Sequence, residues 1–206
     1  MSKAKIAVIS YSLWGHVAEL AKEAAEGARA TGADVTEYQI AETFSPEVLV
    51  KMKADKSLTK DLPVLNAQDL KNFDGLVFAF PTRFGRAPAQ VSALFDRTGG
   101  LWASGSLLGK HVTMITSAGT QHGGVETTAL TTFPFFVHHG MIYVPIGFQF
   151  PELSEISEIT GISPYNAATV AGGNNSRRPT EKELRVSKAQ GTYFAEIVGQ
   201  FVRGKI

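Results

Sequence analysis

One short segment near the amino terminus has the composition of a phosphate-binding turn. It follows an apolar run directly and offers a hydroxyl, a glycine and several backbone N–H groups: Ser12, Leu13, Trp14, Gly15, His16 and Val17. N–H groups at the start of a helix carry partial positive charge and bind a dianion well. The chain has neither G-x-G-x-x-G nor G-x-x-x-x-G-K-[ST], which disfavours a dinucleotide fold and a P-loop NTPase. We expect the phosphate of a mononucleotide here, although many such turns only cap a helix.

Two further loops carry groups that suit a flat heteroaromatic ring. The first combines an aromatic ring, a guanidinium and a glycine in Thr82, Arg83, Phe84 and Gly85. The second is rich in hydroxyls and glycine and contains Ser117, Ala118, Gly119, Thr120, Gln121, His122 and Gly123. Backbone N–H groups of such loops can donate hydrogen bonds to the ring, and glycine lets the backbone approach closely. Three loops that converge therefore predict one ligand with a phosphate and a ring.

The composition limits the chemistry that the protein can perform. Cysteine is absent, which excludes disulfides and thiol redox reactions, so electron transfer would need a bound organic cofactor. His122 has no acidic or histidine neighbour at metal-ligand spacing, and we expect no metal site. A net charge of +1 gives no reason to expect nucleic acid as a partner. Without a signal-peptide pattern or an apolar run of ~18 residues, we expect a cytoplasmic protein with no membrane span.

Apolar runs and helical periodicity alternate along the chain, as in a doubly wound α/β fold. Short apolar runs predict strands at residues 5–10, 75–80, 111–116 and 141–146, and residues 34–40 alternate as in a further strand. Helical spacing and capping signals predict helices near residues 17–31, 47–53, 68–72, 88–95, 126–137 and 179–201. Strands that are apolar on both faces indicate a parallel sheet with helices on both sides. We expect one flavodoxin-like domain over residues 1–206, with a five-stranded sheet in the order 2-1-3-4-5.

The stretch 148–173 is too long for a simple connection between a strand and a helix. We interpret Ala167 to Ala171 as a second half of the fifth strand, and the residues before it as an insertion at the sheet edge. The segment Gly99 to Trp102 reads as a glycine-rich loop, which favours a binding surface for Trp102. In a sheet of this order, ligands bind beyond the carboxyl ends of the strands, where the three polar loops would lie.

Several strings resemble the WrbA family of NAD(P)H:quinone oxidoreductases, in collinear order over nearly the whole chain. They are PTRFG (81–85), FDRTGGLWASGSLLGK (95–110), the loop at 117–124, HHGM (138–141), VPIG (144–147) and ISPYNAATVAGG with SRRPTEKEL towards the end. The combination of PTRFG, TGGLW and HHG is highly specific. The resemblance implies an FMN-dependent homotetramer, a dimer of dimers, that passes two electrons from NADH or NADPH to a quinone. We expect a ping-pong order, in which the oxidised nucleotide leaves before the quinone enters.

The resemblance also assigns roles to the three loops. Residues 12–17 resemble the family's phosphate loop, and residues 82–85 and 117–123 resemble its ring-binding loops. His139 resembles the residue that contacts the pyrimidine end of the flavin. Its place at an expected helix end also suits a histidine without a ligand, because a helix carboxyl end favours a cation.

Two tryptophans resemble substrate residues of the family. Trp14 corresponds to an aromatic residue that contacts the nicotinamide nucleotide, and Trp102 to one that lines the substrate pocket. We expect Trp102 and Phe84 to form an aromatic slot over the flavin, with neighbouring subunits closing the pocket.

Other functions of the same fold compete with this interpretation. A flavodoxin-type electron carrier has no substrate pocket and is usually acidic, whereas this chain is nearly neutral. A scaffold that keeps the flavin but turns over little substrate remains an alternative. A receiver-type signalling domain needs acidic residues beyond the first and third strands, where this chain has Tyr11 and Ser12 and then Thr82 and Arg83, so that class is disfavoured.

Overall fold

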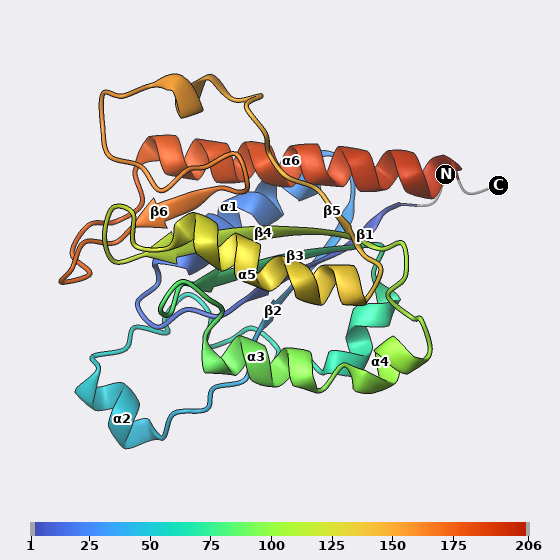
Figure 1. Ribbon diagram of the computed structural model, residues 1–206, viewed down its shortest axis with the longest axis horizontal. Coiled ribbons are helices and arrows are strands. Elements are labelled where there is room, and N and C mark those ends of the chain that lie inside the picture. Colours follow the sequence, from blue (N-terminus) through green and yellow to red (C-terminus); the bar gives the residue numbers. More distant parts are fainter. Residues whose placement is uncertain (1–2, 205–206) are drawn as a thin grey trace.

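Parallel strands form a single sheet in the computed structural model, which describes residues 3–204 (Figure 1). The strands are β1 (Lys5–Ser10), β2 (Asp34–Gln39), β3 (Gly75–Pro81), β4 (His111–Ala118), β5 (Ile142–Tyr143) and β6 (Ala168–Val170). Their order is β2-β1-β3-β4-β5, with β6 also paired to β4. The predicted order 2-1-3-4-5 and the flavodoxin-like fold class are confirmed.

Two short strands share the fifth position of the sheet. Ile142 of β5 pairs with the first residue of β4, His111, whereas Ala168 of β6 pairs with Thr116 near its other end. The chain between them leaves the sheet and returns, which confirms the predicted insertion. The predicted strand 141–146 is shorter than expected because the chain turns away after Val144, whose carbonyl accepts a hydrogen bond from the Thr113 side chain (2.8 Å).

Helices cover both faces of the sheet, as the two-sided apolar strands require. They are α1 (His16–Ala30), α2 (Pro46–Lys51), η1 (Ala67–Asn72), α3 (Ala89–Asp96), α4 (Gly99–Ala103), α5 (Val125–His138), η2 (Pro151–Ser154) and α6 (Glu181–Gly204). In β1, Ile6 and Val8 face α1 and α6, whereas Ala7 and Ile9 face the layer that contains η1, α3, α4 and α5 (Figure 1). This alternation follows from the two-residue period of a strand.

Two sequence-based predictions about helices are wrong. Pro88, expected as the first residue of a helix, is the extended N-cap of α3. The segment read as a glycine-rich loop is the short helix α4, so Trp102 stands on a helix. Glycine lowers helix propensity by about 1 kcal/mol relative to alanine, but burial of Leu101 and the hydrogen bond from Trp102 N to Thr98 O (3.0 Å) favour the helix here.

The insertion is fastened to α6 by a carboxylate that is completely buried. Glu183 accepts hydrogen bonds from the backbone N–H of Gly161 (3.0 Å), the hydroxyl of Thr169 (2.7 Å) and the backbone N–H of Thr180 (2.9 Å). It also forms an ion pair with Arg177 at 3.1 Å. The last of the backbone bonds belongs to the capping box that the sequence predicts at the start of α6. One side chain therefore holds the insertion, β6 and α6 together.

Replacing Glu183 tests this arrangement. Glu183→Gln should lower the free energy of unfolding by about 2–4 kcal/mol, because it leaves Arg177 and several N–H groups without a charged acceptor. The matched control is Glu181→Gln, an exposed glutamate of the same helical turn, which should change stability by less than about 0.5 kcal/mol. Urea unfolding followed by circular dichroism measures both. Equal stability of the two variants would contradict the role of Glu183.

Candidate functional site

The three polar loops leave the sheet at the same edge. Ser10 pairs with Ala79, and Pro81 pairs with Ser117, so β1, β3 and β4 end side by side. A small cavity of about 50 Å³ opens between the loops. Its lining comes from all three loops and from the tail after β6: Ser12, Leu13, Trp14, His16, Val17, Pro81, Thr82, Arg83, Ser117, Ala118, Gly119, Ala171 and Asn175. Most of the residues predicted to bind the cofactor are thus brought together.

The phosphate loop ends in a helix start that has no side-chain cap. Gly15 is the N-cap of α1 with φ 85°, and no side chain caps the first turn. The Ser12 hydroxyl accepts a hydrogen bond from Gly15 N (3.0 Å), which holds the turn, while Glu19 N donates to Gly15 O (2.9 Å) as the helix begins. The first-turn N–H groups therefore point out of the helix towards the edge of the sheet where β1, β3 and β4 end, which we call the loop edge. An anion there can accept hydrogen bonds from them.

The tail before α6 folds over this helix start. His16 Nε2 lies 3.1 Å from Asn175 O, and Arg178 donates to Trp14 O (2.9 Å) and pairs with Glu19. Burial, followed by the charge of Arg178, lowers the pKa of His16, which favours the neutral imidazole. No binding or structural role was predicted for Asn175 or Arg178 from the sequence. The signal that could have found them is the adjacent pair Arg177 and Arg178, which lies between the glycines at 172–173 and the start of α6.

Arg83 brings a partly buried cation to the cavity. Its guanidinium lies over the Trp14 ring, 5.7 Å from the centroid, and donates to Thr82 O (2.9 Å). The second terminal nitrogen, Nη2, is buried and has no hydrogen-bond partner among the described residues. A buried donor without a partner costs free energy, and a ligand acceptor would remove that cost. Arg83 therefore fits a ligand with carbonyl or phosphate oxygens.

The loop after β3 is held by α5. The Thr82 hydroxyl accepts from Gly85 N (3.1 Å) and from the Thr128 hydroxyl (2.7 Å). A Cβ on Gly124 would stand 3.0 Å from Gly85 Cα, so glycine is required for this close approach. These contacts fix the backbone of residues 82–85 against the start of α5, as expected for a loop that orients a planar ring.

Phe84 points away from the protein. It has a positive φ of 54°, and its side chain is fully exposed. Together with Phe44, Pro88 and Arg86 it borders an open cavity of about 460 Å³. An exposed aromatic ring beside an apolar hollow is typical of a surface that a ligand or another chain covers.

The loop after β4 serves two cavities. Gly119 lines the small cavity, whereas the next residues, Thr120, Gln121 and His122, line a neighbouring cavity of about 390 Å³. The whole loop, residues 117–123, was predicted to bind the ring, but only its part up to Gly119 lines the small cavity. Gly123 makes a turn in which its N–H donates to Thr120 O (3.1 Å).

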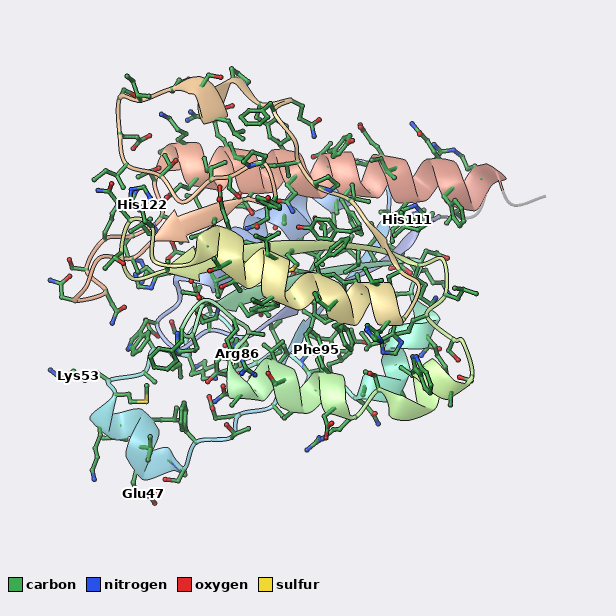
Figure 2. All side chains as sticks on the ribbon, viewed as in Figure 1. Glu47, Lys53, Arg86, Phe95, His111 and His122 are labelled. Atoms are coloured by element: carbon green, nitrogen blue, oxygen red, sulfur yellow. The ribbon has the colours of Figure 1, made fainter. Side chains whose placement is uncertain are left out.

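Trp102 and His139 lie at the opposite edge of the sheet from the loops. Trp102 is on α4, which precedes the first residue of β4, and His139 caps the carboxyl end of α5. Figure 2 shows that the two edges are far apart, with His122 at the loop edge and His111, which starts β4, at the other. Trp102 therefore does not meet Phe84 within one chain.

One nitrogen of the His139 imidazole contacts a neighbouring hydroxyl, and the other, Nδ1, is buried without a hydrogen-bond partner among the described residues. Its Nε2 lies 2.9 Å from the hydroxyl of Thr98, the N-cap of α4, and the ring packs against Phe135. Burial, followed by the charge of His138, lowers the pKa of His139. In this chain His139 steadies α4, and so Trp102.

A polar cluster behind the phosphate loop was missed in the sequence. Glu42 accepts from the Tyr11 hydroxyl (3.1 Å) and from Gln90 (3.0 Å), and it pairs with Lys56 at 2.8 Å. Burial alone would raise the pKa of Glu42, but hydrogen bonds from Lys56 and two backbone N–H groups lower it to about 2. The cluster anchors residues 42–56 behind the loop. Tyr11 and Gln90 are 31 and 48 positions away from Glu42 in the sequence, and no spacing pattern links them to it.

Comparisons with known proteins identify the family and the fold of the chain. Residues 4–152 match the sequence profile of the family described as NADPH-dependent FMN reductase. NAD(P)H quinone oxidoreductase PST1 of Candida albicans is 42% identical over 96% of this chain and 99% of its own. Quinone-oxidoreductase QR2 of Triphysaria versicolor is 46% identical over 94% of both chains. A WrbA-like flavodoxin structure from Agrobacterium tumefaciens aligns over 96% of this chain and 99% of its own with a TM-score of 0.67 at 18% identity, which supports the fold.

The described residues contain no helix long and apolar enough to cross a membrane. No group of three or more His, Asp or Glu side chains within residues 3–204 is placed to hold a metal ion. The profile match and the near full-length relatives show the family. The chain belongs to the NADPH-dependent FMN reductase family, and its expected resemblance to the WrbA group of NAD(P)H:quinone oxidoreductases is confirmed.

Proposed function

We propose that the protein is an FMN-dependent oxidoreductase that transfers two electrons from NADH or NADPH to a quinone. The observation that carries the proposal is the loop edge itself. An uncapped helix start, a partly buried guanidinium with a free donor and two backbone loops meet at one place. The names of the relatives, which describe quinone oxidoreductases, support the same substrate class.

The residues at this edge fit the parts of FMN. The start of α1, with Gly15 and His16, would hold the phosphate, because its N–H groups donate to an anion. Arg83 and the backbone of residues 82–85 and 117–119 would bind the polar edges of the ring. Bound FMN supplies the two-electron chemistry, accepting a hydride from the nicotinamide and passing two electrons to the quinone. With one proton from water, NAD(P)H and quinone become NAD(P)⁺ and hydroquinone.

The protein contributes orientation and the exclusion of water rather than acid–base groups. Trp14 and Phe84 flank the loop edge from two sides and offer aromatic surface to a nicotinamide or a quinone. Since one surface would serve both substrates in turn, we propose a ping-pong order.

Trp102 and His139 can reach a flavin only from another copy of the chain, and we propose a homotetramer on this basis. A run of exposed apolar side chains continues from α4 along the outer face of α5: Trp102, Leu108, Leu130, Phe133, Val137 and Ile142. An apolar surface of this kind is typical of a subunit interface. The cytoplasmic location expected from the sequence stays a prediction.

The first test is cofactor identity and turnover. The purified protein should bind one equivalent of FMN, and the flavin released by heat should run as FMN on chromatography. It should then reduce a soluble benzoquinone with NADH or NADPH. A protein that retains FAD, or that binds FMN tightly but turns over no quinone, would refute this function, and the second result would favour an electron carrier.

Gly15 tests the phosphate site. Gly15→Ala should lower FMN affinity by about tenfold, equivalent to ~1.4 kcal/mol, because a Cβ there would stand 2.9 Å from Arg178 Nη2 and strain the helix start. Gly32→Ala is the matched control: Gly32 has φ 86° but no atom near its would-be Cβ. Both variants should lose about 1–2 kcal/mol of stability from the left-handed backbone. FMN titration by fluorescence measures the difference, and equal FMN affinities would argue against the assignment.

Mixed oligomers test the shared pocket. Trp102→Ala should raise the quinone KM, and Gly15→Ala should reduce flavin binding. When the two variants are unfolded, mixed and refolded, about one quarter of the sites should combine intact halves by random pairing, so activity should exceed the sum of the parents. Mixing Gly15→Ala with Arg83→Ala should give no such gain, because both residues belong to the same loop edge. Equal behaviour of the two mixtures would show that the pocket is not shared.

A further inference from the structure

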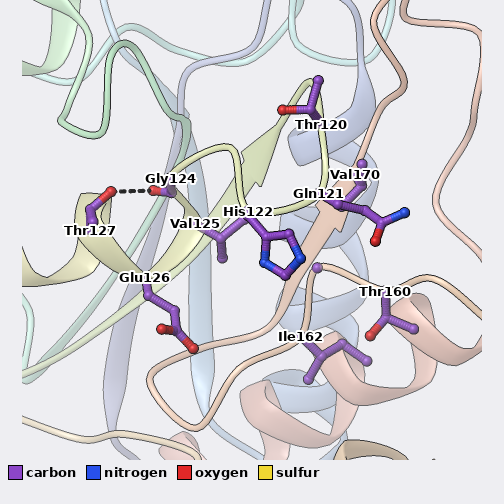
Figure 3. A pocket seen from close by; sticks show the side chains of 11 residues that line it. Thr120, Gln121, His122, Gly124, Val125, Glu126, Thr127, Thr160, Ile162 and Val170 are labelled. Carbon is purple, nitrogen blue, oxygen red and sulfur yellow. Dashed lines mark hydrogen bonds between the residues drawn. The ribbon is translucent and has the colours of Figure 1, made fainter. Parts of the chain in front are cut away.

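The larger cavity beside the loop after β4 has no part in the steps described so far. It measures about 390 Å³ and lies between that loop and residues 160–162 of the insertion (Figure 3). Its polar side chains are Gln121, His122, Glu126 and Thr160, and Ile162 supplies apolar surface. Cavities of this size and mixed lining commonly hold part of a nucleotide or another small molecule.

The polar groups of this cavity are not committed to the protein. Glu126 is exposed on the first turn of α5, and within residues 3–204 its carboxylate has neither a hydrogen bond nor an ion pair. The same holds for the side chains of Gln121 and His122 in the described structure. Figure 3 shows the imidazole of His122 between Glu126 and Gln121. His122 also has a positive φ of 56°, a strained conformation for a residue other than glycine.

The charge of the cavity is negative. Among the described lining residues, none is a lysine or an arginine, and Glu126 is the acidic member. Arg177, before α6, and Lys182, in its first turn, are both paired. Arg177 binds the buried Glu183 at 3.1 Å, and Lys182 binds Glu155 at 2.8 Å. No lysine or arginine side chain among the described residues lines the cavity, so the positive charge nearest to the Glu126 carboxylate is the partial charge at the start of α5.

The cavity adjoins the proposed flavin site along the backbone. Gly119 lines the small cavity between the three loops, and the next residue, Thr120, lines the larger one. A ligand that follows this loop from one cavity to the other would place its two ends in chemically different surroundings. A nicotinamide dinucleotide has this form, because two nucleosides are joined by a pyrophosphate.

We propose that this cavity binds the adenosine end of the electron donor and that Glu126 selects NADH over NADPH. The proposal rests on the function proposed above. A carboxylate accepts hydrogen bonds from the vicinal hydroxyls of an adenosine ribose, as in other dinucleotide sites. A 2′-phosphate replaces one of these donors by roughly two negative charges, which the carboxylate repels. Ile162 and Val170 offer apolar surface for the adenine.

The test uses two probes that carry no nicotinamide, adenosine diphosphoribose and its 2′-phosphorylated counterpart. Their binding to the FMN-loaded protein is measured by isothermal titration calorimetry. The wild-type protein should bind the first probe about tenfold more tightly than the second. Glu126→Gln should remove most of that difference, and Glu126→Arg should reverse it. Glu181→Gln, which changes an exposed glutamate in the first turn of another helix, should leave both affinities unchanged.

Because neither probe is a redox substrate, the result does not depend on quinone turnover. Equal binding of the two probes by the wild-type protein would overturn the proposal, as would an equal shift of both affinities in Glu126→Gln. Quinone turnover is measured on the same samples. Turnover without discrimination between the probes would refute only the role of Glu126, whereas discrimination without turnover would refute only the proposed function.

Discussion

The parallel pairing of β1, β3 and β4 determines where this protein can bind a ligand. All three strands end at one edge, and the hydrogen bonds of the sheet continue one residue further, from Tyr11 N to Ala79 O (2.9 Å) and from Thr82 N to Ser117 O (2.8 Å). The loops therefore start from fixed positions. Beyond that point their N–H groups no longer meet another strand, and they can bind a ligand instead.

The rest of the chain supports these loops from behind and from above. Glu42 holds residues 42–56 behind the phosphate loop, and α5 holds the loop after β3 through Thr128. The split fifth strand lets the insertion leave the sheet and return beside β4, where Glu183 fastens it. Each support is a partly or fully buried polar group that is hydrogen-bonded to another part of the chain. Such groups are costly to leave unpaired, so the arrangement is well defined.

Much of the fold could be predicted from the sequence, because the strands are apolar on both faces and each is followed by a polar loop. The two parts of the fifth strand were also recognisable, since 148–173 is too long for a loop. Helix α4 was not, because its two glycines suggest a loop, whereas the burial of Leu101 that favours the helix depends on the tertiary structure. Glu42 could not be assigned either, since its partners Tyr11 and Gln90 are distant in sequence. Trp102 and His139 lie far from the three loops because each precedes the start of a strand, whereas the loops follow the ends of strands.

The central claim is that three loops at one edge of the sheet bind a single FMN. Hydrogen–deuterium exchange of the protein with and without FMN tests this most directly, because it reports on every loop in one measurement. FMN should slow exchange in residues 12–19, 82–86 and 117–119 together, with slower exchange also in the tail 172–178 that covers the start of α1. Protection in only one of the three loops, or none in any of them at saturating FMN, would contradict the claim.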